Sequence, residues 1–221
     1  MKIVQITAID LTIKAFLIPL IEALCKQGHQ LYLITSDKNR LIQNLDIVKK
    51  YGIQVYDLDI PRTISLSRIF NAYRKMKSIF QKIKPDIVHT HTPVASLISR
   101  MSARHAHIKN IICTIHGFYF HERMPSWKFF LFSQLEKILA KYYTDYLFTV
   151  NQEDRKFAIE HHFLDKHRIT YIHSVGIDAQ NVFNPANYSA QQKNKIRANL
   201  GLTEGKKILT FVGRIVQEKA S

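Results

Sequence analysis

The sequence of 221 residues has few of the residues that break or cross-link a chain. It contains 7 glycines and 6 prolines, too few for long linkers, whereas 46% of its residues are hydrophobic, which is typical of a folded globular protein. Its two cysteines, Cys25 and Cys113, stand far apart inside apolar segments and lack the spacing of a metal or redox site. We therefore interpret them as buried free thiols in a reducing compartment.

The sequence also lacks long hydrophobic runs. The first residues, MKIVQITAID, contain no apolar stretch long enough for a signal peptide, and no segment approaches the ~18 apolar residues of a transmembrane helix. Acidic residues are scarce, since 17 Asp and Glu stand against 32 Lys and Arg, for a formal net charge of +15. We therefore expect a cytoplasmic protein with an anionic partner, namely a membrane surface, a nucleic acid or a phosphorylated substrate.

What the sequence does have is a regular alternation of short apolar runs and helical patterns. Most runs are rich in Val, Ile, Leu and Phe without a polar face, as in parallel strands that are covered on both sides. The predicted strands are 2–6, 30–35, 53–58, 86–90, 110–115, 146–150, 169–173 and 207–212, and the predicted helices are 12–27, 40–51, 65–84, 93–107, 127–143, 152–162 and 189–200. The pattern predicts a Rossmann-like, doubly wound parallel α/β sheet of seven strands within residues 1–178.

Turn-forming residues dominate 174–188, which we interpret as a linker. One helix and one apolar strand follow, too little for a two-sided core. We therefore expect residues 179–221 to contain linker and the first helix and strand of a second, incomplete domain.

Candidate site residues follow the strands, because open parallel sheets bind ligands at the carboxyl ends of their strands. The loop after the first strand, TAIDLT, has no glycine, which excludes a GxGxxG fingerprint and a Walker A loop there. After the fourth strand, His89 and His91 lie on the same side of the chain. We favour a ligand contact for this pair over a metal site, for which no third ligand has suitable spacing. The alternative is one buried histidine and one surface histidine.

A third histidine, His116, follows the fifth strand and precedes Gly117, where the backbone can turn sharply. An imidazole there could orient or deprotonate a substrate hydroxyl, or it could be a core histidine bonded to the backbone. His121 stands nearby and fits either interpretation. After the last predicted strand, Arg214 and Lys219 could both face a diphosphate.

Residues 61–85 contain no acidic residue and carry an apolar stripe with helical spacing, made of Leu66, Ile69, Tyr73, Met76, Phe80 and Ile83. We expect the stripe to pack on the sheet. The unbalanced charge around it favours attraction to anionic lipid through Arg68, Arg74, Lys75, Lys77 and Lys82. A second segment, 118–132, has more aromatic residues than one helix face can bury, and an exposed part would suit a lipid tail or a membrane interface.

Five stretches stand in order along the chain: HTHTPVASLISRMSAR, TIHGFYFHE, VNQEDRKFA, SVGIDAQNVFNP and FVGRIVQEK. In this order and spacing the chain resembles the bacterial family-4 retaining glycosyltransferases, and among them the capsule and O-antigen type. The resemblance implies a GT-B fold, in which a first Rossmann-like domain binds the acceptor and a second binds a nucleotide-sugar. It also implies that the enzyme needs no metal or other cofactor.

The resemblance assigns roles to individual positions. His116 matches the family's active-site histidine, near the transferred sugar. Other matches form an acceptor-side set, which consists of His89, His91, Gly117 and His121. The remaining matches form a donor-diphosphate set, which consists of Gly213, Arg214 and Lys219. The positive side chains of the donor set would stabilise the leaving diphosphate in place of a metal cation. The basic and aromatic segments would lie on the cytosolic face of the membrane, where a polyprenyl-diphosphate-linked acceptor resides.

Two features depart from the family's pattern. The loop after the first strand lacks the glycines that members often carry, and the E-x7-E motif of the donor domain does not occur in these 221 residues. We therefore expect the chain to be inactive unless a donor half is supplied, for example as a separate chain. The alternative is a non-catalytic truncated product that binds membrane or acceptor. Nucleic-acid binding is not favoured, because no RRM, KH or helix-turn-helix signature is present.

Overall fold

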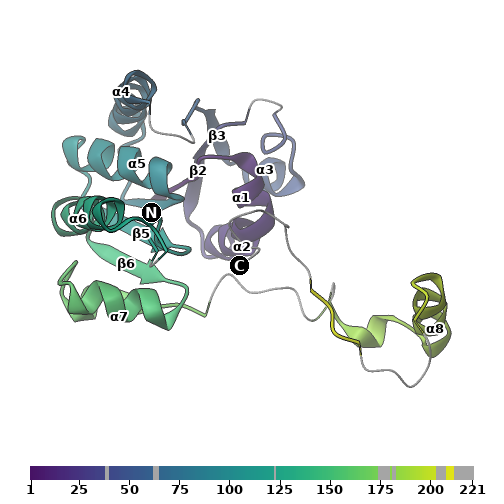
Figure 1. Ribbon diagram of the computed structural model, residues 1–221. Coiled ribbons are helices and arrows are strands. Elements are labelled where there is room, and N and C mark those ends of the chain that lie inside the picture. Colours follow the sequence, from purple (N-terminus) through teal and green to yellow (C-terminus); the bar gives the residue numbers. More distant parts are fainter. Residues whose placement is uncertain are drawn as a thin grey trace. The chain divides into compact units, whose positions relative to one another are not determined.

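The computed structural model describes residues 1–37, 40–61, 65–121, 123–173, 180, 183–202 and 208–211 (Figure 1). The chain divides into two compact units, Met1–Gly176 and Ile177–Ser221.

The first unit is built on a seven-stranded sheet in which all neighbouring strands are parallel. The strands are β1 (Lys2–Ile6), β2 (Gln30–Thr35), β3 (Gln54–Asp57), β4 (Ile87–His91), β5 (Asn110–Ile115), β6 (Tyr146–Thr149) and β7 (Ile169–Tyr171). Their spatial order is β3-β2-β1-β4-β5-β6-β7, so the direction of winding reverses between β1 and β4. The predicted Rossmann-like sheet is confirmed, with small shifts at strand ends.

Helices connect the strands. They are α1 (Asp10–Thr12), the π-helical η1 (Ile13–Leu17), α2 (Ile18–Lys26), α3 (Asp46–Tyr51), α4 (Leu66–Ile83), α5 (Pro93–His105), α6 (Ser126–Tyr143), α7 (Gln152–Glu160) and the 3₁₀ turn η2 (Lys166–Arg168). Figure 1 shows α4, α5 and α6 as neighbours, in agreement with the packing of α5 against both other helices.

Two helix predictions were wrong in detail. The segment 12–27 is not one regular helix, because it passes through η1. We attribute this to Pro19, whose missing N–H removes one helical hydrogen bond. The segment 40–51 is helical only from Asp46, because the buried Asp37 carboxylate accepts hydrogen bonds from the backbone N–H groups of Ile42 and Gln43 and holds a turn there.

The sheet has an apolar layer on each face. On one face Val4 and Ile6 belong to the cluster that contains Met76 and Phe80 of α4 and Ile98 of α5. On the other, residues of β1 and β2 pack with η1, α2 and α3, in a cluster formed by Ile3, Leu31, Leu33, Ile13, Leu17, Ile21 and Val48. Because side chains alternate along a strand, Gln5 shares this second face with Ile3.

The cysteine prediction was half right. Cys113 is buried beneath α5, with its Sγ 3.2 Å from the Ser96 hydroxyl, whereas Cys25 on α2 is only partly buried. Both are free thiols.

The second unit contains η3 (Pro185–Asn187) and α8 (Ala190–Asn199) in its described part. A capping box between Ser189 and Gln192 begins α8, which fits the helix predicted over 189–200. The strand predicted over 207–212 is not present in the described residues 208–211, and no strand of this unit is described that could pair with it.

Candidate active site

Three histidine rings meet at the carboxyl edge of the central strands. His89 and His91 belong to the end of β4, and His116 directly follows β5. The ring centroids of His89 and His91 lie 4.3 Å apart, and those of His91 and His116 lie 5.5 Å apart. The structure therefore brings together the three histidines that the strand-end argument singled out.

His89 packs against the two strands β5 and β6. Its Nε2 lies 2.7 Å from the Thr114 hydroxyl of β5, and the edge of its ring meets Phe148 of β6 at a centroid distance of 6.0 Å. It is buried, as is His91. Neither imidazole therefore has an open approach for a ligand.

His91 links β1 to His116. Its Nε2 lies 3.0 Å from Oε1 of Gln5, and its Nδ1 lies 3.2 Å from Nε2 of His116. An amide oxygen can only accept, so a neutral His91 donates from Nε2 and accepts at Nδ1. His116 must then donate from Nε2, which leaves its Nδ1 as a hydrogen-bond acceptor. We call this chain, Gln5–His91–His116, the histidine relay.

The surroundings keep His89 and the two histidines of the relay neutral. Burial, and secondly the nearby His116, lowers the pKa of His89 to about 3. Burial, followed by the neighbouring imidazoles, holds the pKa of His91 well below its usual value. Partial burial of the ring also lowers the pKa of His116, although the residue as a whole is exposed to solvent. His116 thus presents an uncharged imidazole that can accept a proton or a hydrogen bond.

Two further features shape the surroundings of His116. The ring of Phe16, from η1, stacks on His116 at a centroid distance of 6.4 Å and is itself partly exposed. Gly117 has φ 112°, which L side chains rarely adopt, and no atom lies within 4 Å of where a Cβ would stand. The backbone conformation, rather than lack of space, therefore requires glycine after His116.

Sequence reasoning missed Gln5 and Phe16. Gln5 had a detectable signal, because it is the only polar residue inside the apolar run IVQI and is buried. Such a residue needs a hydrogen-bond partner, and it finds His91 across the β1–β4 pair. Phe16 had no such signal, since an aromatic residue in a helical pattern is ordinarily core.

The other predicted site residues are His121 and the donor-diphosphate set. His121 is exposed, and within the described residues no contact joins its side chain to the three rings. Gly213, Arg214 and Lys219 lie outside the described residues.

Helix α4, which carries the predicted basic residues, differs from expectation at its first turn. Leu66 is 80% exposed rather than packed on the sheet, because the part of α4 that joins the apolar cluster begins only at Ile69. Arg68 is also paired, with its Nη2 3.0 Å from both carboxylate oxygens of Asp59. The remaining predicted cations are exposed, except Lys77, which is partly buried: Arg74, Lys75, Lys77 and Lys82.

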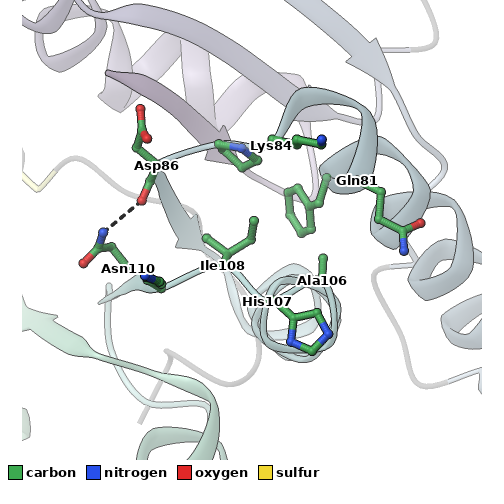
Figure 2. Close-up of a pocket in the computed structure, with 10 residues that line it drawn as sticks. Gln81, Lys84, Asp86, Ala106, His107, Ile108 and Asn110 are labelled. Atoms are coloured by element: carbon green, nitrogen blue, oxygen red, sulfur yellow. Dashed lines mark hydrogen bonds between the residues drawn. The ribbon is translucent and has the colours of Figure 1, made fainter.

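A hollow of about 570 Å³ lies away from the histidines (Figure 2). It is bounded by the ends of α4 and α5 and by the starts of β4 and β5, so it belongs to the amino edge of the sheet. There the Asn110 side chain donates to the carbonyl oxygen of Asp86 at 3.0 Å. We do not assign the active site there, because ligands of such sheets bind at the opposite edge.

The sequence profile of Glycosyltransferase Family 4 matches residues 15–180, the region that holds the histidine site. The chain belongs to this family. The family-4 chain is 28% identical over 214 residues to EpsD of Bacillus subtilis (strain 168), a protein assigned as a glycosyltransferase; the match covers 95% of this chain and 52% of that protein. It is 31% identical over 158 residues to an Escherichia coli UDP-Gal:alpha-D-GlcNAc-diphosphoundecaprenol alpha-1,3-galactosyltransferase. That match covers 72% of this chain and 39% of the galactosyltransferase.

The family-4 chain spans about half the length, or less, of these curated relatives. Among solved structures, a glycosyltransferase from Rickettsia africae ESF-5 has the same fold, with a TM-score of 0.64 at 19% identity over 92% of this chain and 50% of that one. In the described residues, no group of three or more His, Cys, Asp or Glu side chains could hold a metal ion, and no helix is long and apolar enough to cross a membrane.

Proposed function

We propose that this chain carries the acceptor-binding half of a retaining glycosyltransferase of surface-polysaccharide biosynthesis. The donor would be a nucleotide-sugar and the acceptor a lipid-linked glycan. Family membership supports the reaction class, and the name of the Escherichia coli relative supports both substrate classes, a UDP-sugar and a sugar linked to diphosphoundecaprenol.

The observation that carries the proposal is the exposed, neutral ring of His116 at the carboxyl edge of the sheet. The histidine relay favours an unprotonated Nδ1 on His116, and this atom can accept a hydrogen bond from a sugar hydroxyl. Orienting that hydroxyl before reaction would supply part of the rate enhancement. Because His89 and His91 are buried, we assign them to positioning His116, with Gly117 and His121 nearer the acceptor.

The donor side remains a prediction. Gly213, Arg214 and Lys219 would hold the donor diphosphate and make a metal unnecessary. For the 221-residue chain alone we expect no sugar transfer, because the donor must be held with its anomeric carbon facing the acceptor and the E-x7-E motif is absent from these residues.

The test separates binding from transfer. A solubilised undecaprenyl-diphosphate-linked monosaccharide is titrated into the 221-residue chain, and binding is followed by NMR of the histidine rings. We expect His116→Ala to abolish binding, whereas His167→Ala, an exposed histidine of η2 before β7, should bind as the unmodified chain does. Binding that survives His116→Ala would overturn the assignment.

A transfer assay completes the test. The chain is incubated with a panel of nucleotide-sugars and the same acceptor, and release of nucleoside diphosphate is measured. Turnover that His116→Ala abolishes would refute the expected inactivity of the chain alone.

A further inference from the structure

Helix α6 is apolar on two opposite sides. Its inner side packs in the third apolar cluster of the first unit, through Ala140, Phe129 and Phe132. Its outer side exposes large apolar side chains, each between 39% and 66% exposed: Trp127, Phe130, Leu131, Leu135, Ile138 and Tyr142. We call these six residues the α6 apolar face. A helix that is apolar all round is ordinarily covered all round, so the face needs a covering partner.

The face forms one side of the helix, with Gln134 and Lys141 between its apolar members. At ~100° per residue, its six members fall within an arc of about 140°, and at ~1.5 Å per residue they extend over about 22 Å. The single carboxylate of α6, Glu136, points to the other side, where its two oxygens accept from Arg100 of α5 at 2.8 and 3.0 Å. No negative charge of α6 therefore lies on the outer side of the helix.

Lysines border the face. Lys128 and Lys137 lie just outside opposite margins of the arc, and Lys141 lies within it near its carboxyl-terminal end. The ammonium groups of Lys128 and Lys141 lie 5.4 Å from the Trp127 ring centroid and 5.5 Å from the Tyr142 ring centroid. Trp and Tyr near the two ends, a mainly apolar middle and nearby cations are the pattern of a helix that lies in a bilayer interface.

We infer that the α6 apolar face is the main membrane contact of this protein, inserted at the surface of a bilayer that contains anionic lipid. Charge complementarity decides the occupant. A second copy would bring the lysines of two α6 helices together on a chain that already carries +15, whereas anionic headgroups would neutralise them. On α4, by contrast, only Leu66 and Phe70 are large exposed apolar residues, and Arg68 is neutralised by Asp59.

This inference extends the proposed function, because it names the surface that meets the membrane of a lipid-linked acceptor. Helices that follow parallel strands begin where the strands end, so the Trp127 end of α6 lies at the same edge of the sheet as His116. The experiment below uses no acceptor and no activity, so its failure and that of the proposed function are distinguishable.

Trp127 is the only tryptophan of the chain and reports on the face directly. Its fluorescence is recorded with vesicles of phosphatidylcholine and phosphatidylglycerol, with phosphatidylcholine alone, and with brominated acyl chains. We expect a blue shift and bromine quenching on the anionic vesicles, both reduced by high salt. No blue shift on vesicles that nevertheless bind the protein would overturn the inference.

Variants locate the contact. Phe130→Ser with Ile138→Ser should weaken vesicle binding at least about tenfold, since two large apolar side chains no longer insert. The matched control, Leu20→Ser with Leu41→Ser, removes exposed apolar side chains elsewhere and should bind normally. The contact would be assigned to α4 instead if vesicle binding were lost in the triple variant Arg74→Gln, Lys75→Gln and Lys77→Gln but kept in the double variant of α6. A dimer in sedimentation equilibrium that Phe130→Ser disrupts would assign the face to a second copy.

Discussion

Mild acid should destabilise the protein through His89. Its pKa falls from the ordinary 6.5 to about 3 in the folded protein, because the ring is buried beside Thr114 and Phe148. A histidine whose pKa is lower in the folded than in the unfolded state makes its full contribution to stability above pH 6.5. That contribution decreases as the pH falls below 6.5, because the unfolded chain then binds a proton that the folded chain does not.

The size of the effect follows from these two values. At about pH 5 the folded His89 is still neutral, whereas this pH lies about 1.5 units below the pKa of His89 in the unfolded chain. The loss of stability is therefore about 2 kcal/mol. The variant His89→Gln cannot take up the proton, and its amide can still bond to the Thr114 hydroxyl. The pH-dependent part of the loss that belongs to His89 should therefore be missing in the variant.

The assay is urea unfolding of both proteins at about pH 7.5 and about pH 5. We expect the unmodified chain to lose about 2 kcal/mol more than His89→Gln between the two conditions. His91, whose pKa is also depressed, is present in both proteins and largely cancels. The exposed His167→Gln should lose as much as the unmodified chain. Equal losses with His89→Gln would mean that the His89 ring is open to water, and its burial in the folded protein would be refuted.

Two other predictions concern stability. Glu136→Gln should cost about 3–5 kcal/mol in urea unfolding, because it leaves Arg100, 1% exposed, without its charge partner; Arg100→Met combined with Glu136→Leu should cost much less, and an equal cost would contradict this reasoning. Gly117→Ala should cost about 1–3 kcal/mol, since only its φ of 112° is unfavourable for alanine, and unchanged stability would show that the loop relaxes without penalty.

Most of the sheet was predictable because its signal is local and redundant. Each strand is a short apolar run between helical patterns, and parity along β4 alone places His89 and His91 on one side. The errors occurred where a distant or specific contact overrides periodicity. Asp37 holds residues 40–45 in a turn through side-chain hydrogen bonds, and Leu66 has helical spacing but lies before the part of α4 that packs on the sheet.

The clustering of the three histidines was predictable, but their hydrogen bonding was not. Alternation and topology bring His116 beside His91, yet which nitrogen of His116 accepts depends on Gln5, from a strand 86 residues away from His91 in sequence. The exposed outer side of α6 was foreseen only as an excess of aromatic residues over 118–132. Its continuation through Ile138 and Tyr142 depends on how far α5 and the sheet cover the helix.

The parallel arrangement of the sheet has a consequence for access. All seven strands end at one edge, and α6 runs back from that edge roughly antiparallel to them. If α6 lies flat on a bilayer, the strands also run along the membrane plane, and the edge that holds His116 opens sideways. A lipid-anchored sugar would then reach the histidine by lateral diffusion in the leaflet, with its headgroup passing the Trp127 end of the helix. Substrate capture would become a two-dimensional encounter, governed by the surface density of acceptor and not by its bulk concentration.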